Sequence, residues 1–189
     1  MGSAAYRDVM NEVASTLPAR TARARAERPG FTAAAEEHLD DVYAYLLYFV
    51  GDCSAAEDLT GETFERALKH WRRYDARRGS ARTWLCQLAR SVALDYLRAE
   101  ARRRRREERY AAALPGQAEE PLANGLSPEL ASAIGTLSAG EREVIALRVV
   151  LELDTDETAR LLGVTRTACT TRLSRALQKL QSTLEANDV

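Results

Sequence analysis

The 189-residue sequence has few of the residues from which catalytic and metal sites are built. It contains three cysteines and two histidines. Because Cys53, Cys86 and Cys169 are far apart and odd in number, neither a disulfide framework nor a zinc-ligand spacing is present. We therefore expect the cysteines to be small buried residues in a reducing cytoplasm, and we expect no metal and no cofactor.

Long hydrophobic runs are also missing. The longest, residues 43–50, has eight residues, whereas a bilayer span needs about 20. The N-terminus shows no basic region followed by an apolar segment and a small-residue cleavage site, the pattern of a secretory signal. These absences predict a soluble cytoplasmic protein with no membrane partner.

Net charge is nearly absent, since 27 Lys and Arg face 28 Asp and Glu. A total of −1 at first argues against a nucleic-acid partner. The net charge is, however, −4 over residues 1–57, +7 over 58–110, −7 over 111–157 and +3 over 158–189. Two basic blocks alternate with two acidic ones, so binding to nucleic acid stays open.

Aromatic residues stop at Tyr110, and all twelve lie at or before it. Trp71, Tyr74 and Trp84 stand among arginines, namely Arg72, Arg73, Arg77, Arg78, Arg82 and Arg90. Aromatic faces among arginines suit single-stranded nucleic acid, where stacking contributes about 1 to 3 kcal/mol per base. Trp84 precedes an apolar stripe and favours a core role, whereas Tyr74, beside a loop, favours base stacking.

Apolar periodicity predicts an all-α fold. The first helix carries a stripe that ends at Gly51 and consists of Leu39, Val42, Tyr43, Leu46, Leu47 and Val50. A second stripe covers residues 64–71, and a third covers 85–96 and continues into five arginines at 102–106. Those arginines indicate either phosphate contact or a solvated helix end. Residues 74–82 read as a loop, and residues 1–31 as a disordered extension.

A second helical unit follows a flexible acidic linker at residues 111–126, which is rich in proline, glycine and glutamate. This unit begins at Ser127-Pro128, and Ser138 with Glu141 predicts a capping box. Asp154 begins a helix over 155–162, which stops at Gly163. The sequence thus predicts two small helical domains, 32–110 and 127–184, with a tail at 185–189.

Residues 155–177 have the layout of a helix-turn-helix, with the turn at residues 163–165. The second helix presents short polar side chains and arginines, namely Arg166, Thr167, Thr170, Thr171, Ser174 and Arg175. Such a helix can enter the major groove. No acidic residue lies between 166 and 184 to repel phosphates. A plain helical hairpin with a solvated face is the alternative.

Carboxylates gather at one other place, since Asp58, Glu62 and Glu65 share a helix face. Paired carboxylates can perform acid–base catalysis, but no histidine, metal cluster or phosphate loop lies nearby in the sequence to complete a site. A protein-docking face is the better interpretation. The chain is therefore not expected to be an enzyme.

Several motifs in order resemble an extracytoplasmic-function (ECF) sigma factor of the sigma-70 family of bacterial RNA polymerase. They are residues 58–67 (Asp-Leu-Thr-Gly-Glu-Thr-Phe-Glu-Arg-Ala), 74–85, 94–98, 137–144, 161–164 and 172–176. The resemblance implies a sigma region 2 bundle and a sigma region 4 helix-turn-helix. It implies a factor that binds core polymerase, recognises the minus-35 and minus-10 promoter elements and helps to melt DNA.

The resemblance also implies site residues. Contact with the clamp helices of the largest polymerase subunit would fall to Asp58, Leu59, Thr60, Glu62, Thr63 and Arg66. The minus-10 element would be contacted by Arg73, Tyr74, Arg77, Arg78, Gly79, Ser80, Arg82, Ser91, Arg98, Arg102 and Arg103. The minus-35 duplex would be contacted by Thr165, Arg166, Thr167, Thr170, Thr171, Arg172, Ser174 and Arg175.

Further partners implied by the resemblance are the flap of the second-largest polymerase subunit and an anti-sigma factor. A stand-alone helix-turn-helix regulator that binds duplex operators is the alternative. The distance between the two promoter elements favours two separate DNA-binding domains. The element names imply about 25 base pairs, which span roughly 85 Å. A compact chain of this size has a radius of gyration near about 16 Å, and an extended linker adds up to roughly 56 Å.

Overall fold

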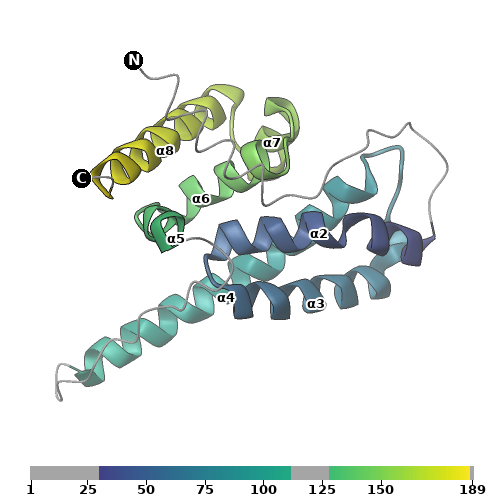
Figure 1. Ribbon diagram of the computed structural model, residues 1–189. Helices are drawn as coiled ribbons and strands as arrows, with labels where there is room; N and C mark the ends of the chain where they lie inside the picture. Colours follow the sequence, from purple (N-terminus) through teal and green to yellow (C-terminus); the bar gives the residue numbers. More distant parts are fainter. Residues whose placement is uncertain (1–29, 112–127, 188–189) are drawn as a thin grey trace.

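The computed structural model describes residues 30–111 and 128–187, in which all regular structure is helical. The first unit contains α2 (Phe31–Val50), α3 (Cys53–His70), the short 3-10 helix η1 (Trp71–Arg73) and α4 (Ala81–Ala111). The second contains α5 (Pro128–Gly135), α6 (Ala139–Ile145), the π-helix η2 (Ala146–Val150), α7 (Thr155–Leu162) and α8 (Arg166–Asn187). The all-α prediction is confirmed (Figure 1). The expected extension, except for its last two residues, and the expected linker, except for residue 111, lie outside the described residues.

The first unit is a bundle in which α2, α3 and α4 pack pairwise. Gly51 ends α2 in the left-handed conformation at φ 82°, which glycine adopts readily. Asp52 then caps α3 by accepting a hydrogen bond from the Ala55 amide at 2.6 Å. This two-residue turn makes α2 and α3 antiparallel neighbours, while α4 runs past both and projects from the body with residues 102–106 near its end (Figure 1).

Helix ends in the second unit follow the predicted caps. The Ser138 hydroxyl and the Glu141 carboxylate form the capping box of α6. Asp154 accepts a hydrogen bond from the Glu157 amide at 2.8 Å and begins α7, and Gly163 at φ 66° ends it. Thr165 accepts from the Ala168 amide at 3.1 Å at the start of α8. These predictions are confirmed because capping depends on residues three positions apart.

The segment after α6 differs from the regular helix that the apolar spacing predicts. The Leu151 amide donates to the Ala146 carbonyl at 2.9 Å, five residues earlier instead of four. Leu147 and Leu151 are nevertheless almost fully buried, as the spacing requires. A wider π turn therefore carries both leucines into the core.

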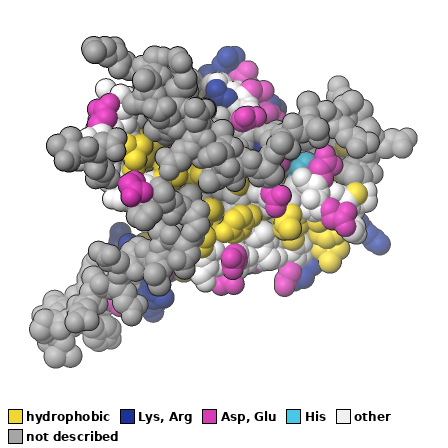
Figure 2. Space-filling view, viewed as in Figure 1, with side chains coloured by type: hydrophobic (Ala, Val, Ile, Leu, Met, Phe, Trp, Pro, Cys, Tyr) yellow, Lys and Arg dark blue, Asp and Glu magenta, His cyan; other side chains and the backbone are white. Residues whose placement is uncertain are grey.

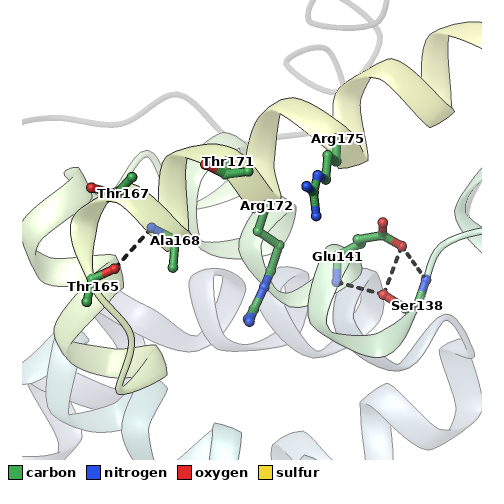
Figure 3. A pocket seen from close by; sticks show the side chains of 8 residues that line it. All are labelled: Ser138, Glu141, Thr165, Thr167, Ala168, Thr171, Arg172 and Arg175. Carbon is green, nitrogen blue, oxygen red and sulfur yellow. Dashed lines mark hydrogen bonds between the residues drawn. The ribbon is translucent and has the colours of Figure 1, made fainter.

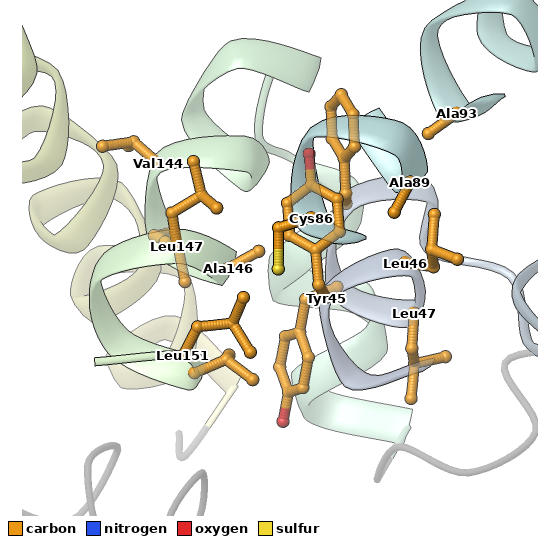
Figure 4. Packing of buried hydrophobic residues seen from close by; sticks show 14 of the residues in the cluster. Tyr45, Leu46, Leu47, Cys86, Ala89, Ala93, Val144, Ala146, Leu147 and Leu151 are labelled. Carbon is orange, nitrogen blue, oxygen red and sulfur yellow. The ribbon is translucent and has the colours of Figure 1, made fainter. Parts of the chain in front are cut away.

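The two units pack directly against each other, which the sequence did not predict. Helix α2 contacts α6 and η2 as well as α3 and α4, and one apolar cluster contains residues of both units (Figure 4). Tyr45 and Phe49, outside the predicted stripe, are 0% and 1% exposed, because α2 is covered on two sides. Leu39, predicted to face inward, is 48% exposed. The predicted stripe was therefore wrong at Leu39, and it missed Tyr45 and Phe49 because the contact between the units adds to the buried face of α2.

The cysteines follow expectation in part. Cys86 and Cys169 are buried free thiols, and Cys53 is half-buried with its sulfur 3.4 Å from the Tyr43 hydroxyl oxygen. Burial raises the pKa of the Cys86 thiol to about 12. Cys86 therefore acts as a small apolar core residue.

No helix within residues 30–111 and 128–187 has both the length and the apolar character needed to cross a membrane.

Candidate nucleic-acid interface

Helices α7 and α8 form the predicted helix-turn-helix, and α8 presents its polar face to solvent. Seven of the eight residues implied at the minus-35 element are exposed: Thr165, Arg166, Thr167, Thr170, Thr171, Ser174 and Arg175. Arg172 is half-buried. This row begins at the α8 N-terminus, where free amides and the helix dipole favour phosphate.

A cavity of about 560 Å³ adjoins this face. Its lining residues come from the start of α6 and the first half of α8, namely Ser138, Glu141, Thr165, Thr167, Ala168, Thr171, Arg172 and Arg175. Figure 3 shows Arg172 and Arg175 extending from α8 on the side of α6 that carries Ser138 and Glu141. The hollow therefore combines arginines and hydroxyl groups, which are phosphate-binding groups.

An ion pair joins α8 to the start of α6. Lys179 Nζ lies 2.9 Å from Glu141 Oε1. The hydrogen bond from Lys179, and next those from Ser138, lower the pKa of Glu141 to about 2. On the outer side, Arg166 Nε lies 3.2 Å from Asp156 Oδ1. Both helices of the motif are thus joined to their neighbours by charge as well as by apolar packing.

In the first unit the aromatic residues of the basic block form a closed cluster. The Trp71 and Tyr74 rings stack at 4.9 Å, and Trp84 and Phe31 lie edge-on to Trp71 at 5.5 and 5.6 Å. Tyr74 is 6% exposed, and its hydroxyl donates to the Gly79 carbonyl at 3.2 Å. A base could stack on Tyr74 only after this cluster opens, so the role of Tyr74 stays a prediction. Trp84, as expected, packs into the core.

The arginines around this cluster are mostly exposed. Among the residues implied at the minus-10 element, the exposed ones are Arg73, Arg77, Arg78, Ser80, Ser91, Arg98, Arg102 and Arg103, and Gly79 is half-buried. Several pair locally: Arg77 Nε lies 3.1 Å from Asp75 Oδ1, and the hydrogen bond from Arg77 lowers the pKa of Asp75. Arg98, Arg102 and Arg103 lie along the projecting end of α4.

Arg82 is the exception. It is 9% exposed, with Nε 2.7 Å from Asp41 Oδ2 and an Nη2 hydrogen bond to the Leu151 carbonyl at 2.6 Å. Its partners belong to α2 and to the segment that follows η2. In this structure, Arg82 is thus occupied between the two units and does not face solvent.

The predicted docking face on α3 is divided by burial. Asp58 and Glu62 are exposed and Arg66 is half-buried. Leu59, Thr60 and Thr63 are buried, and both threonines donate to carbonyls one turn earlier. In Figure 2 acidic side chains are spread over the α2–α3 part of the surface, with hydrophobic side chains between them. The surface available to a partner therefore carries both charged and hydrophobic side chains, and the threonines lie behind it.

The α3 carboxylates do not converge on a catalytic site. Glu62 pairs with Arg66 at 2.5 Å and Glu65 with Lys69 at 3.4 Å, each one turn along the helix. In the described ranges, no group of three or more His, Cys, Asp and Glu side chains is arranged to hold a metal ion.

Sequence reasoning missed the polar residues between the units. Glu143 of α6 is 4% exposed and accepts from Arg90 Nε at 2.6 Å and from the Tyr45 hydroxyl at 3.3 Å. Burial raises the pKa of Glu143, and Arg90 opposes that shift. Arg142 Nε donates to the Phe49 carbonyl at 2.9 Å. No sequence signal could have found these contacts, because partners 53 to 98 residues apart share no spacing rule.

Comparison with known proteins places both units in one family. The family described as Sigma-70 region 2 matches residues 34–103, and Sigma-70, region 4 matches residues 127–180. The chain is 33% identical to the ECF RNA polymerase sigma factor SigC of Mycobacterium tuberculosis over 151 residues, which cover 79% of this chain and 80% of that protein. It is 31% identical to the ECF RNA polymerase sigma factor BldN of Streptomyces coelicolor, covering 77% of this chain and 56% of that protein.

Solved structures show the same fold. The sigma factor RpoE from Bartonella quintana, crystallised with the anti-sigma factor NepR, has a TM-score of 0.64 at 23% identity, covering 82% of this chain and 96% of that one. CnrH in complex with the cytosolic domain of CnrY has a TM-score of 0.59 at 22% identity, covering 96% and 98%. The arrangement of α2 to α8 thus has known counterparts.

Proposed function

The chain belongs to the ECF group of the sigma-70 family of RNA polymerase sigma factors, and we propose how its two units divide promoter recognition. The region 4 unit reads the minus-35 duplex through α8. The region 2 unit docks core polymerase through α3 and binds the minus-10 element through the loop before α4 and through the start and the projecting end of α4. The main support for this proposal is one face of α8, which exposes hydroxyl groups and arginines directly after the Gly163 turn. The chain also contains region 2 and region 4 in that order.

The chemistry of α8 suits a duplex. Hydroxyls of Thr167, Thr170 and Thr171 can donate to or accept from base edges, and arginine binds guanine or phosphate in a bidentate manner. The aromatic residues that could stack a separated base are all in the other half of the sequence. Region 4 therefore reads paired DNA and leaves strand separation to region 2.

Region 2 provides what melting needs. The exposed arginines of α4 neutralise phosphates, and the aromatic cluster supplies faces on which separated bases can stack once it opens. The free energy for melting comes from trapping single-stranded bases on the protein. The factor acts without catalysing a reaction of its own.

Partner surfaces follow from the exposed charges. Asp58, Glu62 and Arg66 on α3 meet the clamp helices of core polymerase, and the region 4 unit contacts the flap. We also propose an anti-sigma partner, because the sigma factor RpoE, which has the same fold, was crystallised with the anti-sigma factor NepR. CnrH, which also has this fold, was solved in complex with the cytosolic domain of CnrY. Co-purification of the tagged chain with a bound regulator tests this, and recovery of the chain without one would contradict it.

The decisive experiment is transcription with purified core polymerase on linear genomic fragments, with mapping of start sites. We expect specific starts that require the chain. Arg166→Glu should reduce them about tenfold or more, since each good base or phosphate contact contributes about 1 to 3 kcal/mol. The matched control Gln178→Glu adds a negative charge to the same helix farther from the turn, and should reduce them little. Unchanged start sites with and without the chain would overturn the proposal.

The alternative function is a stand-alone regulator that binds duplex operators. The helix-turn-helix alone is compatible with it, so a gel shift without polymerase separates the two. The sigma function predicts weak binding of promoter fragments by the free chain and strong binding with core. Tight, sequence-specific binding without core would favour the regulator.

A further inference from the structure

Arg82 connects the two units at the most polar point of their contact. It lies in the first turn of α4, and its guanidinium joins Asp41 of α2 to the carbonyl of Leu151 at the end of η2. Among the residues that the structure describes, it is the most deeply buried cation. A guanidinium at this depth is stable only while its donors have acceptors.

On the region 4 side, the Leu151 carbonyl is a suitable acceptor for the Arg82 guanidinium. Leu151 follows the last turn of η2, and carbonyls at a helix C-terminus have no donors within the helix and carry partial negative charge. An arginine that binds there satisfies the helix end and holds the region 4 unit. Asp41, on the other side, fixes the guanidinium from within region 2.

Two further contacts extend this attachment along α4. The Thr83 hydroxyl donates to Glu157 of α7 at 3.2 Å, and Arg90 donates to Glu143 of α6 at 2.6 Å. The N-terminal part of α4, which follows the loop with proposed minus-10 contacts, thus contacts the region 4 unit. This part of α4 cannot bind region 4 and minus-10 DNA at the same time.

We propose that Arg82 is a latch with two exclusive uses: in the closed chain it binds Asp41 and the Leu151 carbonyl, and in the open chain it binds the phosphates of single-stranded minus-10 DNA. This inference rests on the proposed function of region 2. The closed chain is the resting form, and single-stranded DNA opens it by taking Arg82. Opening also separates the readers, which must reach elements roughly 85 Å apart.

The proposal predicts that substitutions at Asp41 and at Arg82 change the affinity for single-stranded DNA in opposite directions. Asp41→Asn weakens the closed form and leaves Arg82 free for DNA. Single-stranded DNA should therefore bind about three- to tenfold more tightly, because a larger fraction of the molecules is open and able to bind it. Arg82→Ala also opens the chain but removes the DNA contact, so binding should weaken. A purely structural ion pair would give no gain in affinity for Asp41→Asn.

The experiment uses the full chain without polymerase. Small-angle X-ray scattering measures its size, and fluorescence anisotropy measures binding of a labelled 12-nucleotide single-stranded DNA of mixed sequence. Asp40→Asn, which removes the same charge from the exposed neighbouring position of α2, is the control. Circular dichroism confirms folding of each variant, and Glu157→Ala, which removes the acceptor of the Thr83 hydroxyl, is a second opening variant at the rim of the contact.

We expect Asp41→Asn and Glu157→Ala to expand the chain and tighten single-stranded binding, with Asp40→Asn unchanged. Added single-stranded DNA should expand the unmodified chain, whereas a duplex of equal length should not. Unchanged size and affinity in both opening variants would overturn the latch. Because scattering does not depend on transcription, the two proposals can fail separately. Normal start sites without expansion of the chain would refute the latch alone, whereas absent start sites would refute the proposed function.

Discussion

The two DNA-binding units present their candidate residues in opposite ways. In region 4 almost the whole row on α8 is exposed and held in place by caps and the Glu141–Lys179 pair. In region 2, Tyr74 is 6% exposed within an aromatic cluster and Arg82 is 9% exposed between the units. The proposed duplex reader of region 4 is therefore preformed, whereas the proposed contacts of Tyr74 and Arg82 with separated DNA strands require region 2 to open.

The largest expected effect tests whether the two units are stable independently. Leu147→Ala in η2 removes a side chain that is 1% exposed in the shared cluster, and should cost about 2 to 5 kcal/mol of unfolding free energy. Both tryptophans belong to region 2, so their fluorescence reports that unit alone. We expect the urea midpoint from fluorescence to fall together with that from circular dichroism.

The matched control for this prediction is Leu68→Ala. Leu68 is 60% exposed, so the free energy of unfolding should change by less than about 0.5 kcal/mol. If Leu147→Ala lowers only the circular dichroism midpoint, the units unfold separately and the shared core contributes little to region 2.

A smaller effect is expected at the cap of α6, which holds the preformed reader. Ser138→Ala removes the hydroxyl half of the capping box, which should cost about 0.5 to 2 kcal/mol. Thermal unfolding followed by circular dichroism measures it. Ser132→Ala, an exposed serine inside α5, should leave the transition in place, and equal effects at both positions would contradict a capping role.

The aromatic cluster predicts a loss of similar or smaller size. Tyr74→Phe keeps the ring that stacks on Trp71 but removes the hydroxyl hydrogen bond to Gly79, which should cost about 0.5 to 1.5 kcal/mol. Urea unfolding by tryptophan fluorescence measures this. Start-site mapping should show retained initiation, because stacking needs the ring only. Loss of initiation with normal stability would assign the hydroxyl a direct role in DNA binding.

The smallest effect is a pH dependence of region 4. The pKa of Glu141 falls from about 4.5 to about 2 on folding. Its contribution is therefore fully present above the unfolded pKa, and is lost as pH falls from about 4.5 through about 2. Urea midpoints at pH 6 and pH 3 should differ less in Glu141→Gln than in the unmodified chain. An equal difference would assign the acid sensitivity to other carboxylates.

Sequence predicted most local features and few contacts between distant segments. The capping box at Ser138, the ends of α7 and the exposed face of α8 all depend on spacings of three or four residues, which a single sequence displays. The burial of Tyr45 and Phe49 depends on α6 and η2, about a hundred residues away. Arg82 shows the limit most clearly, because its position among arginines indicated DNA and gave no sign of Asp41 or the Leu151 carbonyl.

The π turn at η2 has a consequence for insertions and deletions. Its hydrogen bond from Leu151 to Ala146 encloses one more residue than an α-helical turn. Deleting one residue between 146 and 150 should therefore leave an ordinary α-helical turn and keep the segment that follows in nearly the same phase. A deletion inside the regular helix α6 would instead rotate everything that follows by roughly 100° about the helix axis and turn the Leu151 carbonyl away from Arg82. The wide turn is thus the place where this helix can lose a residue without changing how the helix-turn-helix faces the rest of the protein.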